Sequence, residues 1–365
     1  MIKSIRLQNF FSFQDCTINL NPGVNVLVGI NGSGKSNLLK AIELFKILPK
    51  ENIEDIGSLV LHKWKGQNGM MHYQSGTTFS ELLFEFDQNF VSYKRHDTEA
   101  PRPLTYLANF KFPGLGIFSF SPTVLAGGER VYSNYHDSEG EKDVSVAFAN
   151  LISAADNIYS YGIFDTSEDA IVRKALTYTS DKVLRPDLRN LSNVINFLSI
   201  NHALHFDLIE KNLQKVNGNY EKLKVIPVLD SMTFGIKETG FEKTTPAYLL
   251  SDGSIKFLAL LAILYNPNRG QLICLDEPEN GLHPDMLHAV AEGIQYAAQT
   301  SQIILSTHSP QLLNWFTFED IRVFEKDENN ATIVKELKQQ EFEGWYDTYL
   351  LGDMWMKGNI GGNRW

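Results

Sequence analysis

The chain has 365 residues and a formal net charge of −10, with 43% hydrophobic and 21% charged residues. Its length allows a large core and more than one domain. The acidic balance argues against a broadly basic surface that coats nucleic acid, although a local basic groove stays compatible with it. A modest gathering of Lys and Arg over residues 173–189 is interpreted as a solvated face.

Apolar runs and cysteines narrow the class of protein further. No apolar run approaches the roughly 18 residues of a membrane span, and the first residues lack the features of a signal peptide. Cys274 lies in an apolar run that is typical of a buried strand, and Cys16 is the second of two cysteines. We therefore expect a cytoplasmic protein without a structural disulfide and without a membrane partner.

The most informative motif lies near the N-terminus. Residues 29–36 match the phosphate-binding pattern G-x-x-x-x-G-K-[ST], after an apolar run at 24–28 and before helical spacing at 37–45. We expect backbone N–H groups to surround nucleotide phosphates, Lys35 to reach the β- and γ-phosphates, and Ser36 to hold Mg²⁺. The expected nucleotide-binding residues are Gly29, Asn31, Gly32, Ser33, Gly34, Lys35, Ser36 and Asn37.

The middle of the chain is predicted to contain a hairpin and then helices. Alternating apolar residues at 82–86 lead to a turn at 87–89, and residues 90–93 are expected to return as the second strand. Residues 144–216 carry helical apolar spacing in several segments, without the sustained heptads of long coiled-coil arms. Residues 220–237 return to a strand-like pattern.

A small polar turn at 250–254 opens a strongly apolar helix over 255–264. Serine is a favoured N-cap, and the N–H groups at such a helix start attract anions. Ser251 and Gly253 are therefore candidate anion-binding residues. An ordinary capped, buried helix is the alternative, and the two interpretations are compatible.

An apolar strand over 271–275 ends in two carboxylates. Asp276 is expected to hold the Mg²⁺ shell, directly or through water. Glu277, one residue on, is expected to point to the opposite side and to polarise a water against a γ-phosphate. The alternative is a strand that simply ends in acidic turn residues.

The last predicted elements are a strand over 303–307 that ends at His308, and a hairpin of 321–325 with 332–336. The tail from 341 is rich in aromatic residues, which we interpret as packing residues. Asp347 and Asp353 are too few to build a metal nuclease there. The aromatic residues of this tail are Trp345, Tyr346, Tyr349, Trp355 and Trp365.

In this order, the motifs resemble those of one group of ATPases. Residues 250–254 resemble the signature loop of ATP-binding-cassette (ABC) ATPases, in the form found in the RecF, OLD and SMC branch. Residues 280–284 resemble the D-loop of that branch, and His308 resembles its switch histidine, a γ-phosphate sensor. Residues 5–13 resemble its N-terminal strand and turn. The chain has Phe11 where many relatives carry a basic residue near the nucleotide, so that phosphate contact does not carry over.

The resemblance covers about 1–50 and 245–325 by motif. The ending also resembles that of short stand-alone AAA-family members of bacterial defence systems. No glutamine loop can be assigned, because Gln88 lies in a predicted turn and residues 117–122, the better-placed lobe boundary, contain no glutamine.

The resemblance implies an α/β fold: a P-loop NTPase with an ABC-type head, a mixed sheet core with N-terminal antiparallel β-strands, and an inserted helical lobe. The expected division has an ATPase core of 1–115 and 245–340. A helical lobe is expected at 116–244 and an aromatic tail at 341–365.

The resemblance also implies a mechanism that uses ATP and Mg²⁺. One chain supplies the phosphate loop, the metal ligands Ser36 and Asp276, and the catalytic residues Lys35, Glu277 and His308. A second chain supplies Ser251 and Gly253 to the same γ-phosphate. ATP thus joins a head-to-tail homodimer, with a higher oligomer left open, and hydrolysis opens the pair.

From this resemblance we expect an ATP-gated switch for a separately encoded effector, a nuclease or toxin of anti-phage or plasmid defence. The alternatives are a RecF-like DNA-repair clamp, which leaves DNA or another nucleic acid open as a partner, and an ATP-binding scaffold with negligible turnover. The acidic charge weighs against the clamp, and Glu277 weighs against the scaffold.

Overall fold

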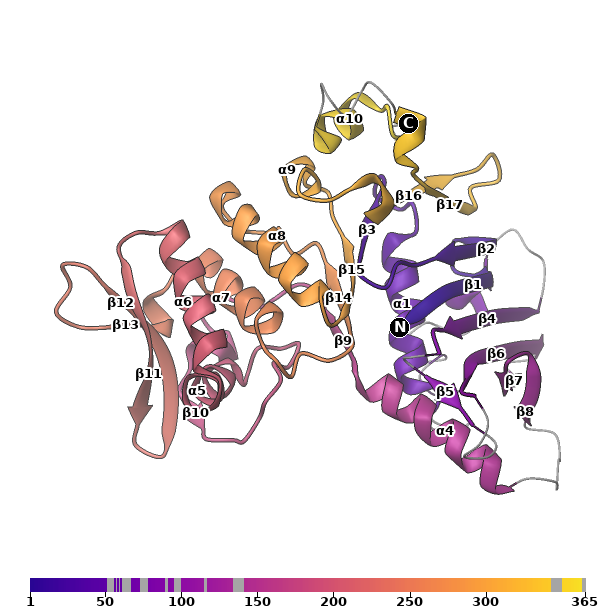
Figure 1. Cartoon of the computed structure of the whole chain (residues 1–365), viewed down its shortest axis with the longest axis horizontal. Coiled ribbons are helices and arrows are strands. Elements are labelled where there is room, and N and C mark those ends of the chain that lie inside the picture. Colours follow the sequence, from indigo (N-terminus) through magenta and orange to yellow (C-terminus); the bar gives the residue numbers. More distant parts are fainter. Residues whose placement is uncertain are drawn as a thin grey trace. The chain divides into compact units, whose positions relative to one another are not determined.

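The computed structural model describes residues 1–50, 56, 58, 60, 67–72, 78–88, 91–94, 100–114, 117–133, 141–342 and 350–362. Its contacts divide the chain into two compact units (Figure 1). Unit 1 comprises Met1–Ile158 and Thr317–Trp365, and unit 2 comprises Tyr159–Phe316. Within the described residues, no helix is both long and apolar enough to span a bilayer.

Unit 1 contains an antiparallel sheet in the order β2-β1-β4-β6-β7-β8, with β5 beside β6. One face of β4 packs on the core, because alternate residues of this strand are buried. The strands are β1 (Ile2–Phe10), β2 (Phe13–Asn19), β4 (Phe79–Phe86), β5 (Ser92–Tyr93), β6 (Arg102–Gly114), β7 (Ile117–Ala126) and β8 (Glu129–Ser133).

The hairpin predicted from 82–86 and 90–93 does not form. β4 pairs with β1 on one side and with β6 on the other, so neither edge is left for the returning strand. β5 pairs with β6 instead. Alternation predicted the strand correctly, but it does not encode the partner. Residue 89 of the predicted turn and residue 90 of the predicted second strand lie outside the described residues.

The second sheet region of unit 1 carries the phosphate loop. β3 (Val24–Val28) lies parallel to β16 (Ile321–Lys326), which pairs antiparallel with β17 (Thr332–Glu336). The closing hairpin predicted from the sequence is thus confirmed. The helical elements of unit 1 are α1 (Lys35–Ile47), α3 (Gln67–Met70), α4 (Glu141–Asp156), η3 (Phe318–Asp320), η4 (Gln339–Phe342) and α10 (Leu351–Lys357).

The core of unit 1 forms between α1 and the antiparallel sheet. The ring of Phe45 on α1 lies 4.9 Å from Phe84, 5.1 Å from Phe86 and 5.5 Å from Tyr106, measured between centroids. All four side chains are fully or almost fully buried. Phe45 lies in the last turn of α1, so this aromatic packing anchors the C-terminal end of the helix to the sheet.

Unit 2 is built on the parallel pair β14 (Leu272–Asp276) and β15 (Gln302–Ser306). The helix α7 (Asp252–Leu264) is buried on nearly all sides, which explains why its sequence is mostly apolar. The other elements of unit 2 are β9 (Ile158–Tyr161), η1 (Ile171–Arg173), β10 (Leu176–Thr177), α5 (Leu191–Asn201), α6 (Ala203–Val216), β11 (Tyr220–Val228), β12 (Ser231–Glu238), β13 (Thr245–Pro246), η2 (Ala247–Leu249), α8 (Pro284–Ala298) and α9 (Pro310–Leu313).

The two units divide the chain differently from the core and lobe expected above. Residues 117–133, expected at the start of a helical lobe, form β7 and β8 of the unit 1 sheet. The helix α4 also belongs to unit 1, whereas α5 and α6 belong to unit 2. The α/β fold class with a mixed sheet and N-terminal antiparallel strands is confirmed.

The C-terminal tail is described in part. α10 ends at Lys357 and is capped by Gly358, and Gly362 N donates to Glu325 Oε1 at 2.8 Å. A Cβ atom built on Gly362 would lie 3.3 Å from Gly29 Cα, so the tail rests against the start of the phosphate loop. Trp355 lies on α10. The other tail residues named above, apart from Asp353, lie outside the described part of the chain.

Candidate nucleotide-binding site

The phosphate loop joins β3 to α1 in unit 1. Gly29, Gly32 and Gly34 have φ values of +149°, +79° and +114°, in a region that glycine adopts readily. A Cβ atom would lie 2.3 Å from Phe324 O at Gly29, and 2.4 Å from Thr332 Oγ1 at Gly34. Conformation and space therefore both require glycine at these two positions.

The polar residues of the loop face different surroundings. Lys35 is buried, and its Nζ donates to the carbonyls of Gly29 at 2.7 Å and Ile30 at 3.0 Å. Ser36, on the first turn of α1, is exposed. Asn31 and Gly32, in the loop itself, are also exposed. All eight residues predicted to bind phosphate thus lie at one helix N-terminus, where N–H groups and the helix dipole attract anions.

A network of side chains joins this loop to the β1–β2 and β16–β17 turns. Asn37 Nδ2 donates to Ser12 Oγ at 2.9 Å. Thr332 Oγ1 lies 2.8 Å from Ser12 Oγ and donates to Ser33 O at 2.6 Å. The loop is therefore held by groups on both turns.

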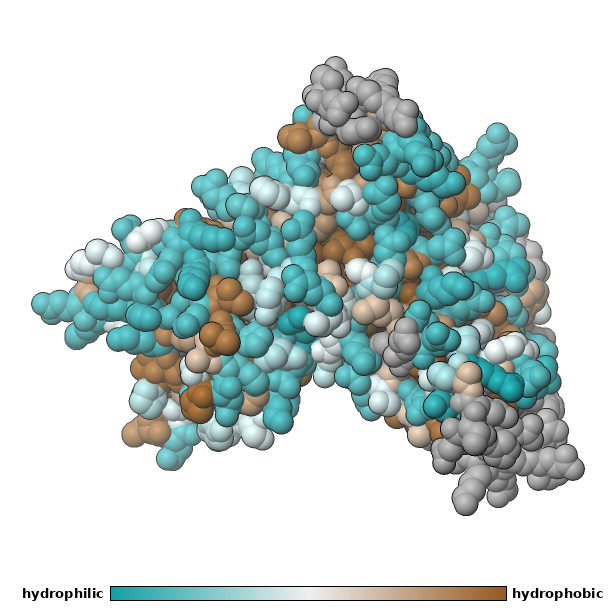
Figure 2. Space-filling view, in the orientation of Figure 1, coloured by the Kyte–Doolittle hydropathy of each residue, from teal (hydrophilic) through white to brown (hydrophobic). Residues whose placement is uncertain are grey.

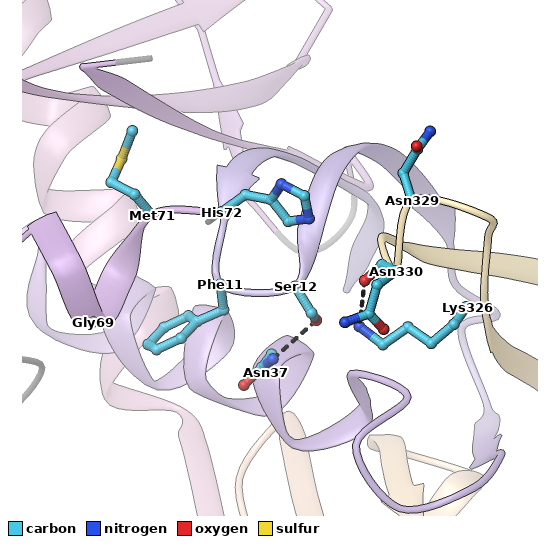
Figure 3. Close-up of a pocket in the computed structure, with 9 residues that line it drawn as sticks. All are labelled: Phe11, Ser12, Asn37, Gly69, Met71, His72, Lys326, Asn329 and Asn330. Atoms are coloured by element: carbon cyan, nitrogen blue, oxygen red, sulfur yellow. Dashed lines mark hydrogen bonds between the residues drawn. The ribbon is translucent and has the colours of Figure 1, made fainter. Parts of the chain in front are cut away.

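A cavity of about 260 Å³ opens beside this network in unit 1 (Figure 3). It lies between the two turns and the first turn of α1. Burial and the charge of Lys326 lower the pKa of His72, which favours a neutral imidazole. The described residues that line the cavity are Phe11, Ser12, Asn37, Gly69, Met71, His72, Lys326, Asn329 and Asn330.

In unit 2, the ends of β14 and β15 bring the predicted acidic pair and switch histidine together. Ser306 Oγ donates to Asp276 Oδ1. His308 Nε2 lies 3.6 Å from Glu277 Oε1. Glu277 has a φ of +51°, and its N–H donates to Ser306 O at 3.2 Å.

That left-handed residue corrects one expectation. Strand alternation was expected to send Glu277 to the side opposite Asp276. The strand ends at Asp276, and the backbone turns at Glu277, so alternation does not apply to the second carboxylate. Both carboxylates instead have partners on the segment 306–308.

A third carboxylate, Glu279, was not singled out from the sequence. Its Oε1 accepts from Thr307 Oγ1 at 2.7 Å and from His308 N at 2.7 Å. Burial raises the pKa of Glu279, although these donors oppose the shift. An acidic residue in a turn ordinarily faces solvent, so only its place directly after the acidic pair could have marked it.

The turn before α7 carries the predicted anion-binding residues Ser251 and Gly253. Ser251 is exposed and caps α7, because its Oγ accepts from Ser254 N at 3.2 Å. Tyr220 Oη lies 3.1 Å from Ser254 Oγ. A Cβ atom on Gly253 would lie 3.2 Å from Gly281 O, so glycine allows this helix start to approach the turn after β14.

Arg173 holds this turn in place. Its guanidinium donates to Leu250 O at 2.7 Å, Ala247 O at 3.2 Å and Asp252 Oδ1 at 2.5 Å. The side chain of Arg173 is 7% exposed. The interpretation of this arginine as part of a solvated face is therefore wrong, because a buried arginine needs the several acceptors that only the folded chain assembles.

Two families of AAA domains match parts of the chain. Residues 1–100 match the family described as "AAA ATPase domain". Residues 190–314 match the family described as "AAA domain, putative AbiEii toxin, Type IV TA system". The first match contains the phosphate loop, and the second contains the signature turn, the acidic pair and His308.

Similar proteins include a DNA replication and repair protein RecF from Limosilactobacillus reuteri, 32% identical over 77 residues. That match covers 21% of this chain and about a fifth, 19%, of the RecF protein. An ATP/GTP phosphatase from Helicobacter pylori is 21% identical, and the match covers 93% of both chains.

Among solved structures, an SMC head bound to the C-winged helix domain of ScpA matches with a TM-score of 0.62 and 17% identity, over 93% of this chain and 99% of that one. The fold is therefore that of an ABC-type P-loop ATPase head. The order of its motifs and its two AAA-domain matches are similar to those of the RecF-, OLD- and SMC-like branch of that class.

Proposed function

We propose that this protein binds and hydrolyses ATP and that ATP joins two copies of it. The observation that carries the proposal is the gathering of Asp276, Glu277 and His308 at the ends of β14 and β15, in a chain that also carries a full phosphate loop. A scaffold with negligible turnover would not need a carboxylate beside a histidine at this point. The related ATP/GTP phosphatase supports the same reaction class.

Each residue has a chemical role in this proposal. The loop N–H groups and Lys35 bind the phosphates, and Glu277 orients and deprotonates the attacking water. His308 contacts the γ-phosphate and keeps Glu277 in position. Assigning residues of both units to one nucleotide rests on the order of the motifs along the chain.

Mg²⁺ fits the proposed donor set. Ser36 offers an exposed hydroxyl, and Asp276 offers a carboxylate that already accepts from Ser306. Mg²⁺ prefers such oxygen ligands and usually takes only one or two from the protein, with phosphates and water completing the shell. When bound, the ion would neutralise charge on the phosphates; Ser36 and Asp276 would hold it.

The dimer is proposed from the signature turn. Ser251 lies exposed at the start of a 13-residue helix, where an anion is favoured. We propose that Ser251 and Gly253 contact the γ-phosphate held by the partner chain, and that the same contact repeats by two-fold symmetry. Loss of the γ-phosphate would then open the dimer.

The biological role that we propose is a switch for a separately encoded nuclease or toxin in anti-phage or plasmid defence, in the cytoplasm. The matched family whose description names a toxin and a toxin–antitoxin system supports this setting. The RecF match keeps a DNA-repair clamp as the second candidate. DNA binding that depends on ATP, without any effector, would favour the clamp.

The deciding experiment is the mass of the purified chain with and without ATP and Mg²⁺, using Glu277→Gln to trap the bound state. We expect the mass to double with ATP. The doubling should disappear in Lys35→Ala, which cannot bind the phosphates, and in Ser251→Arg, which blocks the contact between chains. A mass that does not respond to ATP would contradict the proposed switch.

A further inference from the structure

The turn between β1 and β2 brings Phe11 and Ser12 to the cavity, and neither residue carries a charge. The positive charge on the cavity wall belongs to Lys326, the last residue of β16. Lys326 is the one lysine or arginine among the described lining residues. Figure 3 shows its side chain extending from the β16–β17 turn toward Ser12 and Asn37.

Two contacts fix the Lys326 amine near the phosphate loop. Its Nζ donates to Asn330 O at 3.0 Å and to Thr332 Oγ1 at 3.4 Å. Thr332 Oγ1 in turn donates to Ser33 O within the loop at 2.6 Å. One hydroxyl group therefore separates the amine from the backbone that is expected to surround phosphate.

The electrostatics of the cavity favour an anion next to this amine. Burial lowers the pKa of Lys326, so the charged amine is partly desolvated and gains from a nearby negative charge. The neutral form favoured at His72 removes a competing cation. Lys40 is not a lining residue, but its Nζ lies 4.7 Å from the centroid of the Phe11 ring and 3.3 Å from Asn37 Oδ1, so a second positive charge stands beside two residues of the cavity wall.

The size and lining of the cavity indicate which part of a nucleotide it takes. Its volume of about 260 Å³ is below the roughly 300–1,000 Å³ of sites that enclose a whole small ligand. Phe11 and Met71 offer apolar surface, and Asn329 and Asn330 offer amides. The cavity opens beside Asn37, one residue past Ser36 and away from Lys35, the residue expected at the β- and γ-phosphates.

We propose that this cavity receives the nucleoside end of the bound nucleotide and that Lys326 contacts its α-phosphate or ribose oxygens. This inference rests on the proposed ATP binding. The β16–β17 turn then supplies the positive charge that the β1–β2 turn lacks. The alternative is that Lys326 only stabilises the β16–β17 turn, through its hydrogen bond to Asn330 O. In that case its removal would not change the affinity for nucleotide.

The first test compares ATP and ADP binding by calorimetry in wild type, Lys326→Met, Lys326→Arg and Lys338→Ala. Methionine keeps the length of the stem and removes the charge, and Lys338 is an exposed lysine just beyond the same hairpin. A charge-assisted hydrogen bond predicts about tenfold weaker binding or more in Lys326→Met. The loss should be equal for ATP and ADP, because both carry the α-phosphate. Arginine should retain most of the affinity.

The outcomes separate this inference from the proposed function. Wild-type affinity in Lys326→Met, with binding lost in Lys35→Ala, would overturn the role of Lys326 and leave ATP binding intact. Equal losses in Lys326→Met and Lys338→Ala would also overturn it, as a general charge effect. A wild type that does not bind ATP would contradict both proposals. A matching thermal unfolding midpoint confirms that Lys326→Met is folded.

A second test uses the unmodified protein and needs no variant. Acetylation of lysines by an amine-reactive reagent is followed by mass spectrometry with and without ATP and Mg²⁺. We expect ATP to slow acetylation of Lys326 several-fold and to leave Lys338 unchanged. Equal acetylation of Lys326 in both conditions would overturn the proposed contact.

Discussion

The phosphate loop of unit 1 and the signature turn of unit 2 are held in place by different means. The loop is fixed by shape, because a Cβ atom at Gly29 or Gly34 would lie within 2.4 Å of neighbouring oxygens. The signature turn is fixed by a side chain from another element, since Arg173 donates to Leu250 O and to Asp252. A short local motif therefore specifies the first site, whereas the second depends on a residue about 80 positions away.

The largest expected effect tests whether unit 2 supplies chemistry while unit 1 supplies binding. Glu277→Gln removes the proposed base and keeps the size of the side chain. We expect ATP turnover to fall by about 10²–10⁴-fold while ATP affinity stays within a few-fold of wild type. Phosphate release and equilibrium binding measure the two quantities. Unchanged turnover would show that Glu277 is not the base.

The next effect tests whether close packing around the glycines fixes the conformation of the phosphate loop. Gly34→Ala combines an unfavourable left-handed residue with a clash against Thr332 Oγ1, which predicts a loss of about 2–5 kcal/mol in the free energy of unfolding. Gly32→Ala is the matched control, because nothing lies within 4 Å of its Cβ and only the strain of about 1–2 kcal/mol remains. Urea unfolding of both variants checks the difference, and equal losses would contradict a steric role for Thr332.

Removing the guanidinium of Arg173 tests the corresponding claim for unit 2. Arg173→Met leaves buried carbonyls without a donor, and we expect a loss of at least about 2 kcal/mol in stability together with weaker ATP-dependent dimerisation. Asp252→Asn is the control. Its side chain is 62% exposed, so losing the ion pair should cost about 1 kcal/mol or less. If Asp252→Asn matched Arg173→Met, the ion pair rather than the carbonyl contacts would hold the turn.

The smallest effect concerns the pH dependence of stability. Because the pKa of Glu279 is raised by burial, the folded protein keeps a proton on Glu279 at pH values where the unfolded chain has lost it. Its contribution to stability therefore decreases as pH rises from the ordinary glutamate range through the raised pKa. Glu279→Gln should remove this slope and leave the other slopes unchanged. Chemical unfolding across that pH range measures it, and an identical pH profile would contradict a buried, proton-holding Glu279.

Glu279 also offers a finer test of how His308 is placed. Glutamine keeps an oxygen that can accept from Thr307 and His308, whereas alanine does not. We expect turnover to fall less than about tenfold in Glu279→Gln and further in Glu279→Ala, with ATP affinity retained in both. A loss of affinity that equals the loss of turnover would point to general disruption rather than to positioning.

The parts of this site that could be predicted from the sequence share one property: their signal is local. The phosphate loop, the strand ending at Asp276 and the β16–β17 hairpin each occupy a few consecutive residues, and the structure contains each element. The ABC-type fold followed from the order of such motifs. The roles of the site residues stay predictions.

What could not be predicted depends on contacts between distant segments. Nothing near Arg173 indicates that it meets the carbonyl of Leu250, and nothing near Glu279 indicates that it accepts hydrogen bonds from Thr307 and His308. The partner of β4 was missed for the same reason, because alternation reveals which face of a strand is buried and not which strand lies beside it. Lys326 reaches the cavity from the end of β16, a strand that pairs with β3 although the two are far apart in the sequence.

The contact of Gly362 with the phosphate loop has a practical consequence for labelling. A labelled side chain introduced at residue 362 would begin 3.3 Å from Gly29 Cα, at the start of the phosphate loop. Bulk or charge introduced at residue 362 would therefore lie next to the loop. An environment-sensitive dye placed there would, by the same proximity, report nucleotide arrival as a change in fluorescence.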